Sequence, residues 1–130
     1  MDQDFDLARC LAGYPHIRLA ILFGSAAAGR QTFESDIDVA VAAQRALSAT
    51  ERVEIVERLA QGTGRAVDLV DLATASGPLL NRALATGRLL FCTDRALYAE
   101  IIKRALYDDA DLAPYRRRIL AARRRAWIGA

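Results

Sequence analysis

The chain has 130 residues, 53% hydrophobic and 26% charged, which is typical of a globular domain and excludes a disordered or fibrous protein. No apolar run is long enough to cross a bilayer, and the acidic start MDQDFD is unlike a secretory signal, so we expect a cytoplasmic protein without a membrane partner. Two cysteines and one histidine, without C-x-x-C spacing, indicate neither a structural zinc site nor a disulfide framework. The length predicts a single domain over residues 1–130.

Hydrophobic patterns predict helices and strands in alternation along the chain. Short apolar runs bounded by turn residues indicate strands, whereas apolar residues at helical spacing between capping residues indicate helices. The expected elements are a helix over 4–13 that caps the sheet edge, strands over 16–23 and 36–42, a helix over 48–61, a strand over 65–72, a helix over 76–87, a strand over 87–92, a helix from 94 onward, and a basic C-terminal helix at about 112–128.

The helix over 48–61 has the most specific local signals. Ser48 and Glu51 form a capping box, in which side chains and backbone N–H groups at the helix start satisfy each other. Its apolar residues recur at helical spacing and predict one packed face. The residues expected on that face are Val53, Val56, Leu59 and Ala60.

The strand over 36–42 carries two acids, Asp36 and Asp38, separated by one apolar residue. Because strand side chains alternate, both acids face the same side, about 6.5–7 Å apart along the backbone. Such a pair repels itself unless a counter-charge is present, and Arg30 is the basic candidate close in sequence. A shared hard divalent cation explains the pair most simply, so the pattern predicts a metal site.

The strand over 65–72 offers a third carboxylate. Asp68 and Asp71 are separated by an odd number of positions, so they face opposite sides of the sheet and at most one can join the first two acids. We favour Asp68, which lies in mid-strand, over Asp71, which lies near the strand end, where an aspartate is more often a turn or cap residue. Sequence alone leaves the choice between them open.

Three carboxylates on one sheet face can hold two Mg²⁺ ions, one to activate an attacking hydroxyl and one to neutralise a triphosphate and its departing pyrophosphate. Gly24 and Ser25 form a small-residue turn in which backbone N–H groups and a hydroxyl can approach phosphate oxygens. The stretch GSAAAGRQ is not a P-loop, because Arg30 and Gln31 replace the lysine and the hydroxyl residue of that motif. Together these features predict nucleotidyl transfer.

The spacing from Gly24-Ser25 across ten residues to Asp36-x-Asp38, with Asp68 on a later strand, resembles the signature of the nucleotidyltransferase superfamily that includes DNA polymerase beta. The segment order ESDIDVAV, VDLVDL, GPLLNRALATGRLLF and DLAPYRRRIL, over about residues 17–120, is similar to the minimal nucleotidyltransferases, and within them to the MntA-type antitoxins of HEPN/MNT toxin-antitoxin modules. The resemblance implies an α/β (α+β) fold, with a small mixed sheet of about four strands flanked by helices.

The resemblance also implies an activity and a set of site residues. The donor would be MgATP with two Mg²⁺ ions, the partner a HEPN-domain (HepT-like) toxin, and the reaction transfer of AMP to a tyrosine hydroxyl that silences the toxin. At position 26 relatives often have a large or basic residue, whereas here Ala26 begins a run of three alanines without such a contact. The implied catalytic and metal-binding residues are Asp36, Asp38 and Asp68, and the expected nucleotide-binding residues are Gly24, Ser25, Arg30 and Ser35.

Two alternative functions use the same sequence features. The first keeps the transfer chemistry but changes the acceptor to a small molecule such as an aminoglycoside, although such enzymes usually add a second domain to bind it. The second is a non-catalytic antitoxin that neutralises its toxin by binding alone. The complete carboxylate set argues against the second, because unused buried acids cost stability.

Residues 115–130 carry six arginines and no acid, which leaves a net charge of −4 on the first 114 residues. This basic segment has three readings: the solvated face of a packing helix, a docking surface for the toxin, or a contact for RNA phosphates. Trp127 is a candidate interface anchor within it. Tyr98 and Tyr107, on the preceding helix, are expected to serve packing.

Overall fold

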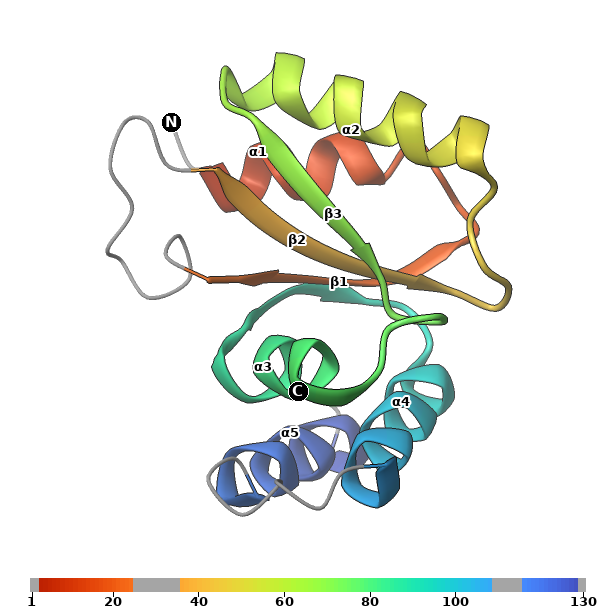
Figure 1. Ribbon diagram of the computed structural model, residues 1–130, viewed down its shortest axis with the longest axis vertical. Helices are drawn as coiled ribbons and strands as arrows, with labels where there is room; N and C mark the ends of the chain where they lie inside the picture. The colour runs from red at the N-terminus through yellow and green to blue at the C-terminus, as the bar shows by residue number, and fades with distance from the viewer. Residues whose placement is uncertain (1–2, 25–35, 109–115, 129–130) are drawn as a thin grey trace.

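The computed structural model describes residues 3–24, 36–108 and 116–128, which form the helices and strands drawn in colour in Figure 1. Each helix and strand expected from the sequence is present, with ends that differ by a few residues. The α/β class is therefore confirmed. In chain order the elements are α1 (Gln3–Leu11), β1 (Ile17–Phe23), β2 (Ile37–Ala43), α2 (Ala49–Thr63), β3 (Val67–Asp71), α3 (Gly77–Thr86), β4 (Arg88–Cys92), α4 (Arg95–Asp108) and α5 (Arg116–Ile128).

The strands form one mixed sheet in the order β3-β2-β1-β4. β1 lies antiparallel to both β2 and β4, whereas β2 lies parallel to β3. A parallel pair needs a crossover connection, which α2 supplies between β2 and β3. The parallel arrangement therefore brings the start of β3 beside the start of β2, where the sequence places its acidic residues.

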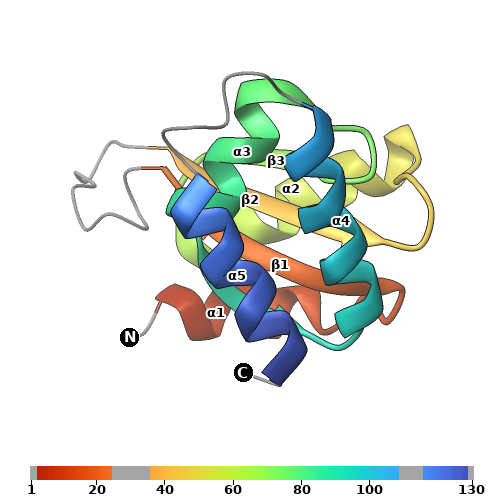
Figure 2. The ribbon, with the colours of Figure 1, turned by 90° about the horizontal axis from the view of Figure 1, so that it is seen from below.

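Helices cover both faces of the sheet, with α1 and α2 on one side and α3, α4 and α5 on the other (Figures 1 and 2). The side chains of β2 alternate between these layers, as its sequence pattern predicts. Asp38, at an even position, therefore points toward α3, α4 and α5. The β2 residues in the first layer are Ile37, Val39 and Val41, and those in the second are Ala40 and Ala42.

Two expectations about helix packing are wrong. α1 does not cap a sheet edge: it packs beside α2 over one face and buries Leu7 and Leu11 there. On α2, Val53 is 58% exposed, and the fully buried residues are Ile55 and Leu59. In both cases the apolar pattern identified the helix correctly, but the surface it meets depends on elements distant in sequence.

The ends of α2 follow the sequence signals closely. The Glu51 N–H donates to the Ser48 hydroxyl at 3.1 Å, and the Ser48 N–H donates to the Glu51 carboxylate at 3.0 Å, so the predicted capping box is confirmed. Gly64 ends the helix with a φ of 70°, in the left-handed region that favours glycine.

The basic helix α5 packs against α3 and α4 through a narrow apolar stripe (Figure 2). Trp127 is 70% exposed, and the side chains of the arginines around it are exposed as well. Docking to a toxin and contact with RNA both stay predictions for this surface. The buried residues of the stripe are Ile119, Ala122 and Ala126, and the exposed arginines are Arg117, Arg118, Arg123, Arg124 and Arg125.

The two tyrosines of α4 have different environments. Tyr98 is buried in the core, as expected, and burial raises the pKa of its hydroxyl. Tyr107 is 80% exposed, so the expectation that it serves packing is wrong.

Among the helices of the described ranges, none is long and apolar enough to span a membrane.

Candidate active site

The start of the parallel strand pair brings two of the predicted carboxylates together. In the register of β2 and β3, Asp38 lies directly opposite Asp68. Partners of this kind on adjacent strands lie about 5 Å apart and project from the same face of the sheet. Asp36 lies two residues before Asp38 at an exposed position just outside β2. The structure thus places all three predicted acids at one end of the sheet.

The electrostatics of Asp38 reflect this crowding. Burial raises the pKa of the Asp38 carboxyl most, the neighbouring Asp68 raises it further, Arg82 lowers it, and Asp36 raises it again. Each nearby acid therefore makes the ionised form of Asp38 less favourable, which a bound cation would reverse.

The donor set at this place fits a hard divalent cation. It consists of carboxylate oxygens, which are the preferred ligands of Mg²⁺, and contains no thiol or imidazole. Within the described ranges, no group of three chelating side chains is already arranged around a single point.

Asp71 has a different environment from Asp68. It pairs with Val41 in the strand register, which puts it on the opposite face from Asp38. The side chain is 3% exposed, and its two oxygens accept hydrogen bonds from the N–H groups of Leu47 at 2.8 Å and Ala73 at 2.9 Å. Asp71 therefore fixes the chain segments that follow β2 and β3, and the register brings Asp68 to the first two acids.

We expect Asp71→Ala to lower the free energy of unfolding by about 2–3 kcal/mol, because two buried N–H groups lose their acceptor. Urea-induced unfolding measures the change. Asp71→Asn, which retains one acceptor oxygen, should lose less, and Asp36→Ala, which removes an exposed carboxylate, should lose almost nothing. Equal stability of Asp71→Ala and the native protein would refute the anchoring role.

Gly24 ends β1 at the same place, with a φ of 75°. Phe23, the residue before it, pairs with Asp38 across the antiparallel ladder. A Cβ atom built on Gly24 would overlap the Asp38 carboxylate. Glycine is thus required here both for the backbone conformation and for the space that Asp38 occupies. The other predicted nucleotide-binding residues, Ser25, Arg30 and Ser35, lie outside the described residues.

A cavity of about 540 Å³ opens at Asp38 and Asp68, and Asp71 at the end of β3 also contributes to its lining. Its walls come from the ends of β1, β2 and β3, from the segment between β3 and α3, and from α3 itself. Two arginines that sequence reasoning did not select also line it, because neither belongs to a motif and both reach it through the fold. The lining includes Phe23, Asp38, Asp68, Arg52, Ser76 and Arg82.

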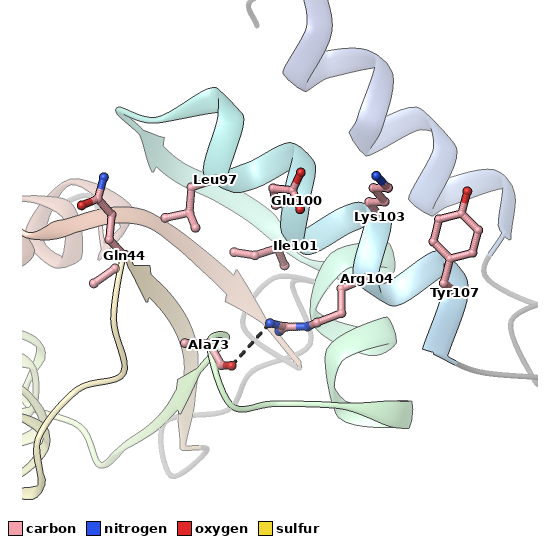
Figure 3. Close-up of a pocket in the computed structure, with 9 residues that line it drawn as sticks. Gln44, Ala73, Leu97, Glu100, Ile101, Lys103, Arg104 and Tyr107 are labelled. Atoms are coloured by element: carbon pink, nitrogen blue, oxygen red, sulfur yellow. Dashed lines mark hydrogen bonds between the residues drawn. The ribbon is translucent and has the colours of Figure 1, made fainter.

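The segment between β3 and α3 is held from its far side by α4. Arg104 donates hydrogen bonds to the carbonyl oxygens of Leu72, of Ala73 at 3.4 Å and of Ala75 at 3.2 Å. Figure 3 shows the side chain reaching from α4 toward Ala73 at the wall of a second cavity, of about 510 Å³. Ala75, one of these hydrogen-bond partners, lines the carboxylate cavity. Arg104 therefore positions one wall of the site.

A mixed sheet with paired carboxylates at the open ends of β2 and β3, beside a glycine turn, is the arrangement of a nucleotidyltransferase. Residues 6–96 match the family model described as Polymerase beta, Nucleotidyltransferase. The match covers more than half of the chain, which therefore belongs to this family. The expectation of a polymerase beta-like nucleotidyltransferase fold is confirmed.

The chain is also similar to antitoxins of known structure. It is 40% identical over 81 residues to Protein adenylyltransferase MntA of Shewanella oneidensis, a match that spans 62% of this chain and 58% of that protein. A crystal structure of a toxin-antitoxin with AMP-PNP contains a chain 32% identical, with 96% of this chain and 94% of that chain covered and a TM-score of 0.69. The homology to MntA antitoxins that the segment order indicated is confirmed.

A second solved structure contains a modified toxin. It is the complex of a tri-AMPylated Shewanella oneidensis HEPN toxin with an MNT antitoxin. Its matching chain is 28% identical, with 98% of this chain and 96% of that chain covered and a TM-score of 0.62.

Proposed function

We propose that this protein is a MgATP-dependent adenylyltransferase that transfers AMP to a tyrosine hydroxyl of a HEPN-domain toxin and so acts as its antitoxin. The observation that carries the proposal is the placement of Asp38 opposite Asp68, in a cavity beside the Gly24 turn. Two relatives support a HEPN toxin as the acceptor of AMP: one is a protein adenylyltransferase, and another occurs in complex with a tri-AMPylated HEPN toxin.

Asp36, Asp38 and Asp68 would hold two Mg²⁺ ions, which supply neutralisation of the triphosphate and a lower pKa for the attacking hydroxyl. Repulsion among these acids supports this assignment, because each added cation relieves it. Gly24 leaves its backbone accessible to phosphate oxygens. The remaining nucleotide contacts are assigned to the segment after it, at Ser25, Arg30 and Ser35.

In the proposed reaction, the tyrosine oxygen forms a bond to the α-phosphorus of ATP. At the same time, the bond breaks between that phosphorus and the oxygen that bridges the α- and β-phosphorus atoms. Pyrophosphate leaves with the electron pair of the broken bond. The phenolic proton passes to the carboxylate of Asp68, which lies next to Asp38. The products are a tyrosine-linked AMP and pyrophosphate, so atoms and charge balance.

The test is incubation of the protein with Mg²⁺, ATP labelled at the α-phosphate, and a HEPN-domain toxin of the kind found in the homologous complex. Label should appear on the toxin and disappear when Asp36→Ala/Asp38→Ala replaces the native protein. Mass spectrometry of toxin peptides should place the added AMP on tyrosine.

Two outcomes would favour the alternatives. Neutralisation of the toxin by Asp36→Ala/Asp38→Ala without any label would show a non-catalytic antitoxin. Label on an aminoglycoside, with none on the toxin, would show a small-molecule nucleotidyltransferase. Either result would refute the proposed acceptor.

A further inference from the structure

Two arginines line the carboxylate cavity, and they differ in what they bind. Arg52, on α2, donates a hydrogen bond to the carbonyl oxygen of Leu69 at 2.6 Å. Its guanidinium is therefore bound to the edge strand β3. Arg82, on α3, forms no ion pair with any carboxylate of the described residues. Neither of these two cavity arginines is in an ion pair within the described residues, but Arg52 is bound to β3, so Arg82 is the one whose guanidinium donors stay available to an anion.

The exposed side chain of Arg82 packs on an aromatic ring. Its guanidinium carbon lies 5.8 Å from the centroid of the Phe23 ring, at cation–π distance. Phe23 is almost fully buried and immediately precedes Gly24, so the ring is a rigid support at the end of β1. The guanidinium thus lies at the end of β1 and lines the same cavity as Asp38.

We propose that Arg82 binds the β- and γ-phosphates of the nucleotide and holds the pyrophosphate as it leaves. This assignment rests on the proposed function, because it needs a nucleoside triphosphate in the cavity. The guanidinium presents a planar fork of donors that matches phosphate oxygens.

The charge balance of the site supports an anion at this place. Arg82 lines the same cavity as Asp38 and Asp68 but forms no ion pair with either of them, so both carboxylates stay available for metal. Negative charge builds on the bridging oxygen as pyrophosphate departs, and a fixed cation stabilises that charge without reorganisation.

The test compares Arg82→Gln and Arg82→Lys with Arg95→Gln, which removes an exposed arginine from the start of α4. Binding of MgATP, Mg-pyrophosphate and AMP to the isolated protein is measured by calorimetry. We expect Arg82→Gln to weaken MgATP and pyrophosphate binding by about 10- to 100-fold and AMP binding by less than about twofold. Arg82→Lys should lose less, and Arg95→Gln should bind all three like the native protein.

The same experiment separates this proposal from a structural role. Thermal unfolding of each variant should match that of the native protein, and Arg82→Lys provides the comparison if Arg82→Gln unfolds early. Unchanged pyrophosphate binding in Arg82→Gln, or an equal loss of AMP binding, would overturn the assignment. If the native protein binds MgATP but never transfers AMP to the toxin, the proposed function fails while the binding comparison still decides the role of Arg82.

Discussion

Asp38→Asn is expected to slow AMP transfer at least about 10³-fold without lowering the stability of the protein. In the proposed site, an amide would not supply the negative charge that two shared Mg²⁺ ions require, so the expected loss is in the rate of transfer. The same change removes one member of the repelling pair formed with Asp68, so the fold loses no favourable charge interaction. Transfer of labelled AMP and urea-induced unfolding, measured on one preparation, test both expectations.

The difference in stability between the native protein and Asp38→Asn depends on pH. The raised pKa of Asp38 means that the folded protein binds a proton more readily than the unfolded chain does. Its ionised carboxylate therefore lowers the free energy of unfolding at pH values above the folded pKa, and this penalty disappears once the pH falls below the unfolded pKa. The native protein should thus be no more stable than Asp38→Asn at neutral pH, and the difference should shrink in acid.

Two further variants complete this experiment. Asp68→Asn should lose activity as Asp38→Asn does, because it removes the opposite member of the pair. Glu57→Gln removes an exposed carboxylate of α2 and should change neither activity nor stability. A fully active Asp38→Asn would refute the metal site, whereas a marked loss of stability would show that Asp38 is a structural residue.

The sequence predicted the elements of this fold well because each begins and ends with a strong local signal. The alternation in the strand over 36–42 predicted its buried and acidic faces, and the structure assigns Ile37 and Ala40 to opposite layers accordingly. The odd spacing of Asp68 and Asp71 predicted that only one of them could join Asp38. The strand register, which no local pattern reveals, then brings Asp68 to Asp38.

What the sequence could not predict depends on contacts between distant elements. Val53 has the spacing of a packed residue but is exposed, because α1 and the sheet meet α2 along a face centred on Ile55 and Leu59. Arg82 and Arg104 have ordinary helical contexts. Their positions at the site follow from how α3 and α4 pack on the sheet.

Gly24→Ala is expected to reduce AMP transfer about 10²-fold through a single added methyl group. The φ of 75° at this position disfavours any residue with a side chain and costs about 1–2 kcal/mol of stability on substitution. The larger effect comes from the methyl group itself, which would overlap the carboxylate of Asp38 and force it from its position beside Asp68. Displacing a catalytic group such as the proposed metal ligand Asp38 by about 1 Å is enough to cause a rate loss of this size.

Gly64 provides a matched control for this substitution, because its φ of 70° is nearly the same and a Cβ atom there would meet nothing within 4 Å. Gly64→Ala should therefore lose stability as Gly24→Ala does, since both alanines must adopt the same unfavourable backbone conformation. Only Gly24→Ala should lose activity. Urea-induced unfolding and the rate of AMP transfer, measured for both variants, separate backbone strain from crowding of Asp38. Equal activity of the two variants would show that the space beside the Asp38 carboxylate is not what the glycine provides.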